Sequence, residues 1–263
     1  MKAVTLHAKA PAKINLGLDI VGKRDDGYHD LRTIMASVSL YDTLTITLTP
    51  CETGEETFTA SAEGVEGDNL AARAARLFMQ RNDLTGWRVH IHIDKRIPIS
   101  AGLGGGSSDA AAVLRILHEW RPMAQNALAG LALELGSDVP YCLHGGTCLA
   151  EGRGEVLTPL APLADCWVVL VTPPVSISTV EAFRRYDEKA VPPRLEGNVF
   201  EDLLSIPVVA EIKQTLTGAG ASNAMMSGSG PTVFGIFEDE NRAKTAFDTL
   251  RAEFPKTFLT KPV

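Results

Sequence analysis

One glycine-rich stretch between a predicted strand and a predicted helix constrains this chain more than any other feature. It reads Gly102-Leu-Gly-Gly-Gly-Ser-Ser-Asp-Ala. Residues 87–94 before it alternate apolar and polar side chains, which is typical of a half-buried strand, and apolar residues recur at helical spacing after it, at Ala110, Val113, Leu114 and Leu117. Glycines let the backbone close around a ligand, and free amides at a helix start favour an anion. The stretch therefore predicts a phosphate-binding loop, with Ser107, Ser108 or Asp109 capping the helix.

Two common phosphate loops do not fit this sequence. A Walker-type loop needs a lysine directly after its last glycine, and none follows here. A dinucleotide fingerprint fails in register at Ser107 and again at Asp109. A glycine turn that merely packs closely stays open, although the flanking strand and helix disfavour it.

Composition limits the classes of protein that remain. A chain of 263 residues accommodates one or two domains, and Pro159 and Pro162 bracket a predicted boundary. A net charge of −7 argues against nucleic acid as a partner, because binding to a phosphate backbone needs clustered Lys and Arg. No apolar run is long enough for a signal peptide or a membrane span, and the four cysteines lack metal-ligand spacing. We therefore expect a cytoplasmic protein with reduced thiols and no membrane partner.

The remaining elements follow from periodicity. Residues 12–20 alternate strictly, which predicts a strand with Lys13 and Asn15 on one polar face. A lysine in such a place usually serves solubility alone. Two further strands are expected at 34–40 and 44–48, broken at Tyr41-Asp42-Thr43, and Asp68 is expected to cap a helix. Gly136 is expected to end a helix just before Asp138. An aspartate in this place is by itself most simply interpreted as another helix cap.

Three segments resemble the three signatures of the GHMP kinases, named for galactose, homoserine, mevalonate and phosphomevalonate. They are Pro11-Ala-Lys-Ile-Asn-Leu, the stretch Pro98–Ala110, and Met226-Ser-Gly-Ser-Gly-Pro-Thr-Val-Phe-Gly, and they stand in the family's order. The resemblance implies an α+β fold with two domains. Residues 1–160 would form an ATP-binding domain like ribosomal protein S5 domain 2, and residues 161–263 a ferredoxin-like domain on the substrate side.

The same resemblance implies the residues that hold ATP and act on it. Lys13 becomes catalytic, and Asp138, in Gly136-Ser-Asp-Val-Pro, becomes the general base. Mg²⁺ would accompany ATP, with the hydroxyl of Ser108 as its ligand. The ATP-binding set comprises Asn69, Pro98, Ile99, Ser100, Ala101, Gly102, Leu103, Gly104, Gly105, Gly106, Ser107 and Ser108.

The segment Gly27-Tyr-His resembles one branch of the family, whose substrate is a cytidylyl methylerythritol. In that branch the tyrosine stacks on the cytosine and the histidine bonds to it, which implies these roles for Tyr28 and His29. Phe183 would form the second face of the base sandwich. The implied reaction moves the ATP γ-phosphoryl group to the substrate's 2-hydroxyl, in isoprenoid precursor synthesis by the non-mevalonate route. The segment Asn198-Val-Phe-Glu departs from the branch, which usually has Asn-Asp-Leu-Glu.

Three alternatives stay open from the sequence. Another GHMP kinase could act on a different small alcohol, although it should lack Gly27-Tyr-His. A decarboxylase of the superfamily would use ATP to drive loss of CO₂. A non-catalytic nucleotide sensor would keep the loop and lose the base or the lysine, and both are present here. Whether the protein is a monomer or a homodimer is open as well.

Overall fold

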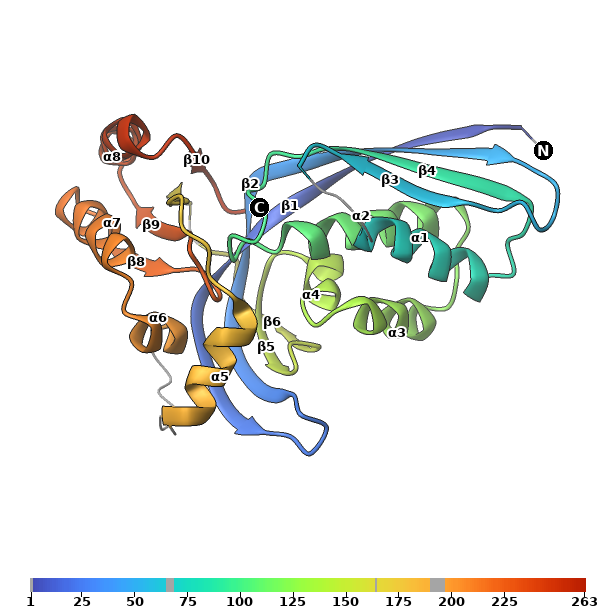
Figure 1. Cartoon of the computed structure of the whole chain (residues 1–263). Helices are drawn as coiled ribbons and strands as arrows, with labels where there is room; N and C mark the ends of the chain where they lie inside the picture. The colour runs from blue at the N-terminus through green and yellow to red at the C-terminus, as the bar shows by residue number, and fades with distance from the viewer. Residues whose placement is uncertain (1, 65–68, 164, 190–196) are drawn as a thin grey trace. The chain divides into compact units, whose positions relative to one another are not determined.

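The computed structural model describes residues 2–64, 69–163, 165–189 and 197–263, and it divides into two compact units that interleave along the chain (Figure 1). Unit 1 comprises Met1–Ala12, Tyr41–Ile97 and Gly105–His144. Unit 2 comprises Lys13–Leu40, Pro98–Gly104 and Gly145–Val263. The functional domains expected at 1–160 and 161–263 are a separate division, which stays a prediction.

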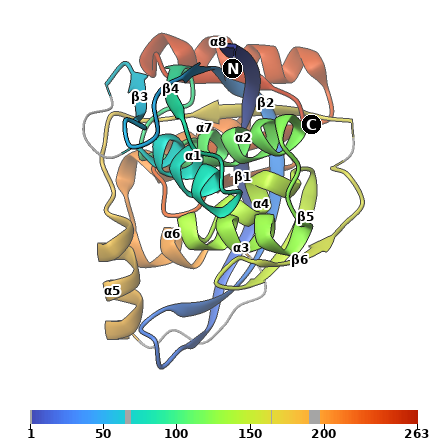
Figure 2. The same ribbon diagram turned by 90° about the vertical axis from the view of Figure 1, so that its right-hand side faces the viewer.

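Two long strands, β1 (Val4–Lys23) and β2 (His29–Pro50), contribute to both units. The hairpin that joins them is the blue segment at the bottom of Figure 2. The expected break at Tyr41-Asp42-Thr43 is wrong, because β2 continues through it. The buried carboxylate of Asp42 accepts bonds from the backbone N–H groups of Arg96 and Ile97, so this turn-forming residue is satisfied within a strand.

Unit 1 is a sheet covered on one face by helices. Strand β4 (Trp87–Asp94) pairs antiparallel with residues 43–50 of β2 and parallel with β3 (Phe58–Ala62). The predicted alternation is confirmed, since Val89, Ile91 and Ile93 are buried between exposed neighbours. The buried face meets a helical layer in which α1 and α2 pack together (Figure 1). Its helices are α1 (Leu70–Arg81), α2 (Gly105–Trp120), α3 (Gln125–Leu135) and α4 (Val139–His144).

The capping predictions in unit 1 need correction. Helix α2 begins at Gly105, so Ser107, Ser108 and Asp109 lie inside its first turns instead of capping it. The side chains of the last two are engaged elsewhere: the Ser108 hydroxyl donates to the Pro11 carbonyl, and Asp109 accepts from Lys95. Asp68, the expected cap of α1, lies outside the described residues, and the N-cap is Asn69.

Unit 2 contains an antiparallel sheet with the strand order β10-β7-β9-β8. In chain order this is 4-1-3-2, and helices α7 (Pro207–Gly218) and α8 (Glu240–Glu253) pack on the sheet. That arrangement is the β-α-β-β-α-β pattern of ferredoxin-like domains, so the prediction is confirmed. The strands are β7 (Trp167–Val171), β8 (Asn223–Met226), β9 (Val233–Phe237) and β10 (Thr257–Thr260).

The rest of unit 2 includes a strand that pairs with the first half of β2, one further strand and two helices. Residues 31–36 of β2 pair with β5 (Thr147–Gly152), which pairs in turn with β6 (Val156–Pro159). Helix α5 (Thr179–Lys189) follows β7 in the chain, and α6 (Val199–Leu204) is a short helix that periodicity did not predict. None of the helices in the described part of the chain is both long and apolar enough to span a membrane.

Candidate active site

The polar face of β1 in unit 2 is buried, which separates Lys13 from an ordinary surface lysine. Lys13 is 5% exposed and Asn15 is 2% exposed. The Lys13 ammonium donates to Asn15 Oδ1 at 2.7 Å, as their place on one strand face predicted. A lysine is seldom buried unless its charge is compensated, and the Asn15 side chain provides one such partner.

The glycine loop approaches β1 and the turn after β8 so closely that two positions exclude a side chain. Gly102 and Gly104 have φ of +78° and +67°. A Cβ on Gly102 would lie 2.1 Å from the Ser227 carbonyl oxygen, and one on Gly104 would lie 2.9 Å from Cγ of Lys13. The backbone N–H of Lys13 donates to the Leu103 carbonyl at 3.0 Å. Gly104 is therefore required for the fit of the loop against β1, and Gly102 for its fit against the turn after β8.

Ser227, in the turn after β8, links all three sequence signatures within unit 2. Its hydroxyl donates to the Gly102 carbonyl at 2.9 Å and accepts the backbone N–H of Asn15 at 3.2 Å. This turn belongs to the third signature, Gly102 to the second and Asn15 to the first. Segments more than 200 residues apart in the chain thus meet at one buried hydroxyl.

The segment that departs from the family pattern holds the same turn in place. Asn198 is 3% exposed, and its amide donates to the carbonyls of Met226 and Gly228 at 2.7 and 2.8 Å. Its Oδ1 accepts the N–H of Phe200, so one side chain also caps α6. Glu201 accepts the N–H of Met226 at 2.8 Å. The two residues that the segment shares with the branch are the ones that make these bonds.

In unit 1, a buried charge cluster joins the chain on either side of the loop. Lys95 donates to Asp109 at 2.9 Å and to Asp42 at 2.5 Å. Burial raises the pKa of Asp109 to about 7, and the neighbouring Asp42 adds to the rise while Lys95 opposes it. Burial alone would lower the pKa of Lys95, but the two carboxylates outweigh it and raise that pKa. The cluster ties the end of β4 to the first turns of α2.

The remaining predicted residues of unit 1 lie at helix starts. Asn69 caps α1 by accepting the N–H of Ala71 at 2.8 Å. Asp138 directly precedes α4, and its carbonyl accepts the N–H of Cys142. Ser108 is 1% exposed, and its hydroxyl donates to the Pro11 carbonyl at 2.7 Å. The described residues contain no group of three His, Cys, Asp or Glu side chains that could hold a metal ion.

The residues predicted to bind a base all belong to unit 2, and their contacts are ones that the sequence did not specify. The rings of His29 and Phe183 stack with centroids 4.9 Å apart. His29 Nε2 lies 2.7 Å from Oδ1 of Asp187, whose pKa is lowered first by Lys23 and then by His29. Tyr28 is 49% exposed, and the Arg153 guanidinium lies 3.7 Å from its ring centroid. Phe183 thus stacks on the histidine, while arginine covers the tyrosine.

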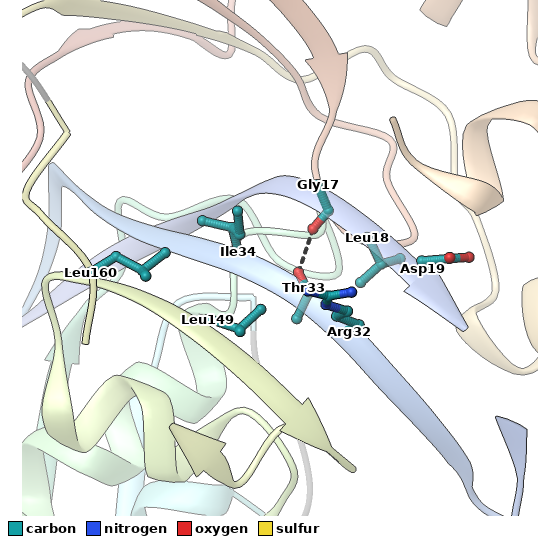
Figure 3. Close-up of a pocket in the computed structure, with 8 residues that line it drawn as sticks. All are labelled: Gly17, Leu18, Asp19, Arg32, Thr33, Ile34, Leu149 and Leu160. Carbon is teal, nitrogen blue, oxygen red and sulfur yellow. Dashed lines mark hydrogen bonds between the residues drawn. The ribbon is translucent and has the colours of Figure 1, made fainter. Parts of the chain in front are cut away.

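A cavity of about 210 Å³ opens beside this part of β1 and β2 (Figure 3). Its charged end carries Asp19 and Arg32, and its apolar end carries Leu149 and Leu160. Thr33 lies between the two ends and donates to the Gly17 carbonyl. The cavity therefore offers an amphipathic lining next to the strand of Lys13.

Sequence reasoning missed Ser227, Asn198, Thr33, Arg153 and Asp187 as residues of these sites. The first lay inside a quoted signature, and Asn198 inside a segment noted as unusual, so a signal existed for both. No local pattern marks the other three, because their partners are distant in the chain.

Comparison with known proteins defines the class to which this fold and loop belong. Residues 69–146 match the GHMP kinases N terminal domain, and residues 194–256 match the GHMP kinases C terminal domain. A homoserine kinase from Cytophaga hutchinsonii has the same fold, with a TM-score of 0.74 at 17% identity over 98% of this chain and 94% of its own. The protein is an ATP-dependent small-molecule kinase of the GHMP type.

More similar relatives narrow the class. The 4-diphosphocytidyl-2-C-methyl-D-erythritol kinase of Exiguobacterium sibiricum is 43% identical over 94% of both chains. That of Alkaliphilus metalliredigens is 40% identical over 99% of this chain and 97% of its own. A crystal structure of 4-(cytidine 5'-diphospho)-2C-methyl-D-erythritol kinase superposes with a TM-score of 0.81 at 35% identity, covering 98% and 99% of the two chains. The chain belongs to this family of kinases.

Proposed function

We propose that the chain transfers the γ-phosphoryl group of ATP to the 2-hydroxyl of 4-diphosphocytidyl-2-C-methyl-D-erythritol, a step of isoprenoid precursor synthesis. The observation that carries the proposal is the buried junction of Lys13, Asn15, Gly102 and Ser227, in a chain about 40% identical over nearly its whole length to kinases of that name. The junction joins the three signatures at a lysine beside the glycine loop.

The transfer needs alignment and neutralised charge more than covalent chemistry. Lys13 supplies a fixed positive charge that stabilises the alkoxide or the transferring phosphoryl group. Asp138 accepts the proton of the hydroxyl as general base. The loop from Pro98 to Ser108 cradles the triphosphate through its backbone amides, and Asn69 contacts the adenine.

Base recognition belongs to the hairpin between β1 and β2 and to α5. Tyr28 has one ring face on Arg153 and is half exposed, which leaves surface for stacking on a pyrimidine. His29 is oriented by Asp187 and bonds to the edge of the base. Phe183 stacks on the histidine ring and supplies the second apolar face of the base-binding sandwich, the first being Tyr28.

Mg²⁺ bound with ATP would neutralise charge on the β- and γ-phosphates. Such an ion keeps several waters and takes further ligands from the phosphates, so the protein supplies few of them. The Ser108 hydroxyl gives its proton to Pro11, and its oxygen keeps lone pairs for a cation. The oligomeric state and the cytoplasmic location stay predictions.

The deciding experiment measures ADP release from Mg-ATP with the cytidylyl substrate, beside mevalonate, homoserine and galactose. We expect turnover with the cytidylyl compound alone. Asp138→Asn should lower kcat by about 10²-fold or more, because a tertiary alcohol is a poor acid. Asp83→Asn, at an exposed site after α1, serves as the matched control.

Turnover of a control alcohol instead would keep the kinase class and overturn the roles given to Tyr28, His29 and Phe183. Release of CO₂ would point to a decarboxylase. Near-full kcat in folded Asp138→Asn would remove Asp138 as the base.

A further inference from the structure

A buried threonine on β2 is connected to the lysine of β1 through the side chain of Asn15. Thr33 is 3% exposed and belongs, with Lys13 and Asn15, to unit 2. Its hydroxyl lies 2.9 Å from Asn15 Nδ2 and 2.6 Å from the Gly17 carbonyl oxygen. Asn15 Oδ1 lies 2.7 Å from Lys13 Nζ. Three buried groups and one backbone carbonyl therefore form a continuous chain of hydrogen bonds (Figure 3 shows its Thr33–Gly17 end).

Both ends of the chain fix the direction of every bond in it. The Gly17 carbonyl can only accept, so the single hydroxyl proton of Thr33 goes to it. The Thr33 oxygen is then left to accept, and it receives an N–H from the Asn15 amide. The Lys13 ammonium can only donate, so it requires the amide oxygen of Asn15. The amide has one orientation that satisfies both neighbours, and the bond to Thr33 holds the amide in that orientation from the side opposite Lys13.

We propose that Thr33 is a positioning residue for phosphoryl transfer, which acts by orienting the Asn15 amide that holds the Lys13 ammonium. The inference rests on the catalytic role proposed for Lys13. Without the hydroxyl, Asn15 Nδ2 would be a buried donor that has lost its acceptor. The amide would then move to find another acceptor for Nδ2, and this movement would take Oδ1 away from Nζ. The ammonium would leave the position that the transition state needs.

The test compares Thr33→Val, which keeps the shape and removes the hydroxyl, with Thr33→Ser, which keeps the hydroxyl. Thr260→Val is the matched control, because Thr260 is equally buried in unit 2 and its hydroxyl also donates to a backbone carbonyl, that of Val168. We expect Thr33→Val to lower kcat by about tenfold or more with the KM for ATP nearly unchanged. Thr33→Ser should stay within about threefold of the parent, and Thr260→Val should match the parent.

A double-mutant cycle separates positioning from mere stability. In a Lys13→Met background, Thr33→Val should cause no further loss of kcat, because the group through which it acts is gone. An equal loss in both backgrounds would overturn the proposal, and so would a kcat for Thr33→Val no lower than that for Thr260→Val. Should Thr33→Val not fold, Thr33→Cys replaces it as the poor hydrogen-bonding partner, and equal kcat for the Ser and Cys variants would overturn the proposal.

The proposed function fails separately from this inference. If the parent chain turns over a different alcohol, the same variants are assayed with that alcohol, and the relation of Thr33 to Lys13 is tested unchanged.

Discussion

Asp109 is a residue whose charge should make the stability of the chain depend on pH. Its pKa rises from 3.8 to about 7 in the fold, chiefly through burial. The folded state therefore binds the proton more readily than the unfolded chain. The stabilisation is complete below about pH 4 and is lost as the pH rises through 7, because the carboxyl must then be charged inside the protein.

We therefore expect Asp109→Asn to gain stability over the parent as the pH rises. Asparagine stays neutral and still offers Lys95 an oxygen. The difference in free energy of unfolding should grow by about 1 kcal/mol or more between pH 5 and pH 8. Urea unfolding at both values measures it, with the exposed Asp94→Asn as the control. A difference that does not change with pH would contradict the argument.

For single residues, the sequence predicted those that lie in recognisable motifs. It missed those whose role depends on a contact with a residue distant in the chain. Lys13 and Asn15 were expected on one strand face because a strand alternates. Thr33 could not be predicted, because its role depends on the pairing of β1 with β2 and on the direction of two hydrogen bonds. The pairing of Lys13 with Asp138 stays a prediction.

Among the elements, the glycine loop carries the sharpest steric requirement. Gly102→Ala would place a methyl carbon 2.1 Å from the Ser227 carbonyl oxygen, at a positive φ that alanine disfavours. We expect it to cost about 3 kcal/mol or more in unfolding free energy and to weaken ATP binding, measured by urea unfolding and calorimetry.

Gly130→Ala in α3 is the matched control for the loop variant. An added Cβ there meets nothing within 4 Å, and the helix favours alanine by about 0.5–1 kcal/mol. It should therefore stabilise the chain and leave ATP binding unchanged. Equal effects of the two substitutions would show that the loop has room for a side chain.

The N-caps of α6 and α8 offer a second comparison between elements. Asp239 caps α8 with one exposed bond to Arg242, and its loss to alanine should cost about 1 kcal/mol and leave kcat unchanged. Asn198→Ala removes a cap and also leaves the carbonyls of Met226 and Gly228 without their buried donor. It should cost about 3 kcal/mol and lower kcat, because the turn of Ser227 loosens. Unaltered kcat in folded Asn198→Ala would separate that turn from the site.

Element positions were predictable where periodicity was strong and unpredictable where capping or burial of polar groups decided. Strand β4 agrees with the apolar pattern of residues 87–94, and residues 12–20 lie within β1 as their alternation predicted. The break expected in β2 is absent because Asp42 finds buried donors. Helices α4 and α6 have six residues each, too few to show a helical period.

For the whole molecule, the family resemblance predicted the fold class. The structure adds which segments of the chain belong to each of the two compact units. The chain passes between the units after Ala12, Leu40, Ile97, Gly104 and His144. Composition and proline positions suggested one boundary near residue 160, since they report on local linkers. Long strands that serve two units carry no such linker signal, because their alternation is continuous.

The junction at Ser227 has a consequence for the order in which a ribosome delivers this protein. Strand β1 leaves the ribosomal exit tunnel first, yet the backbone N–H of Asn15 bonds to the hydroxyl of Ser227, which is translated 212 residues later. Lys13, the glycine loop and the proposed base Asp138 have all been translated once residue 138 is added, more than 80 residues before Ser227. Contacts so distant along the chain form slowly, because their ends must first be brought together. A nascent chain that stops before the third signature thus holds Lys13 and Asp138 and lacks Ser227, the residue that bonds the strand of Lys13 to the glycine loop.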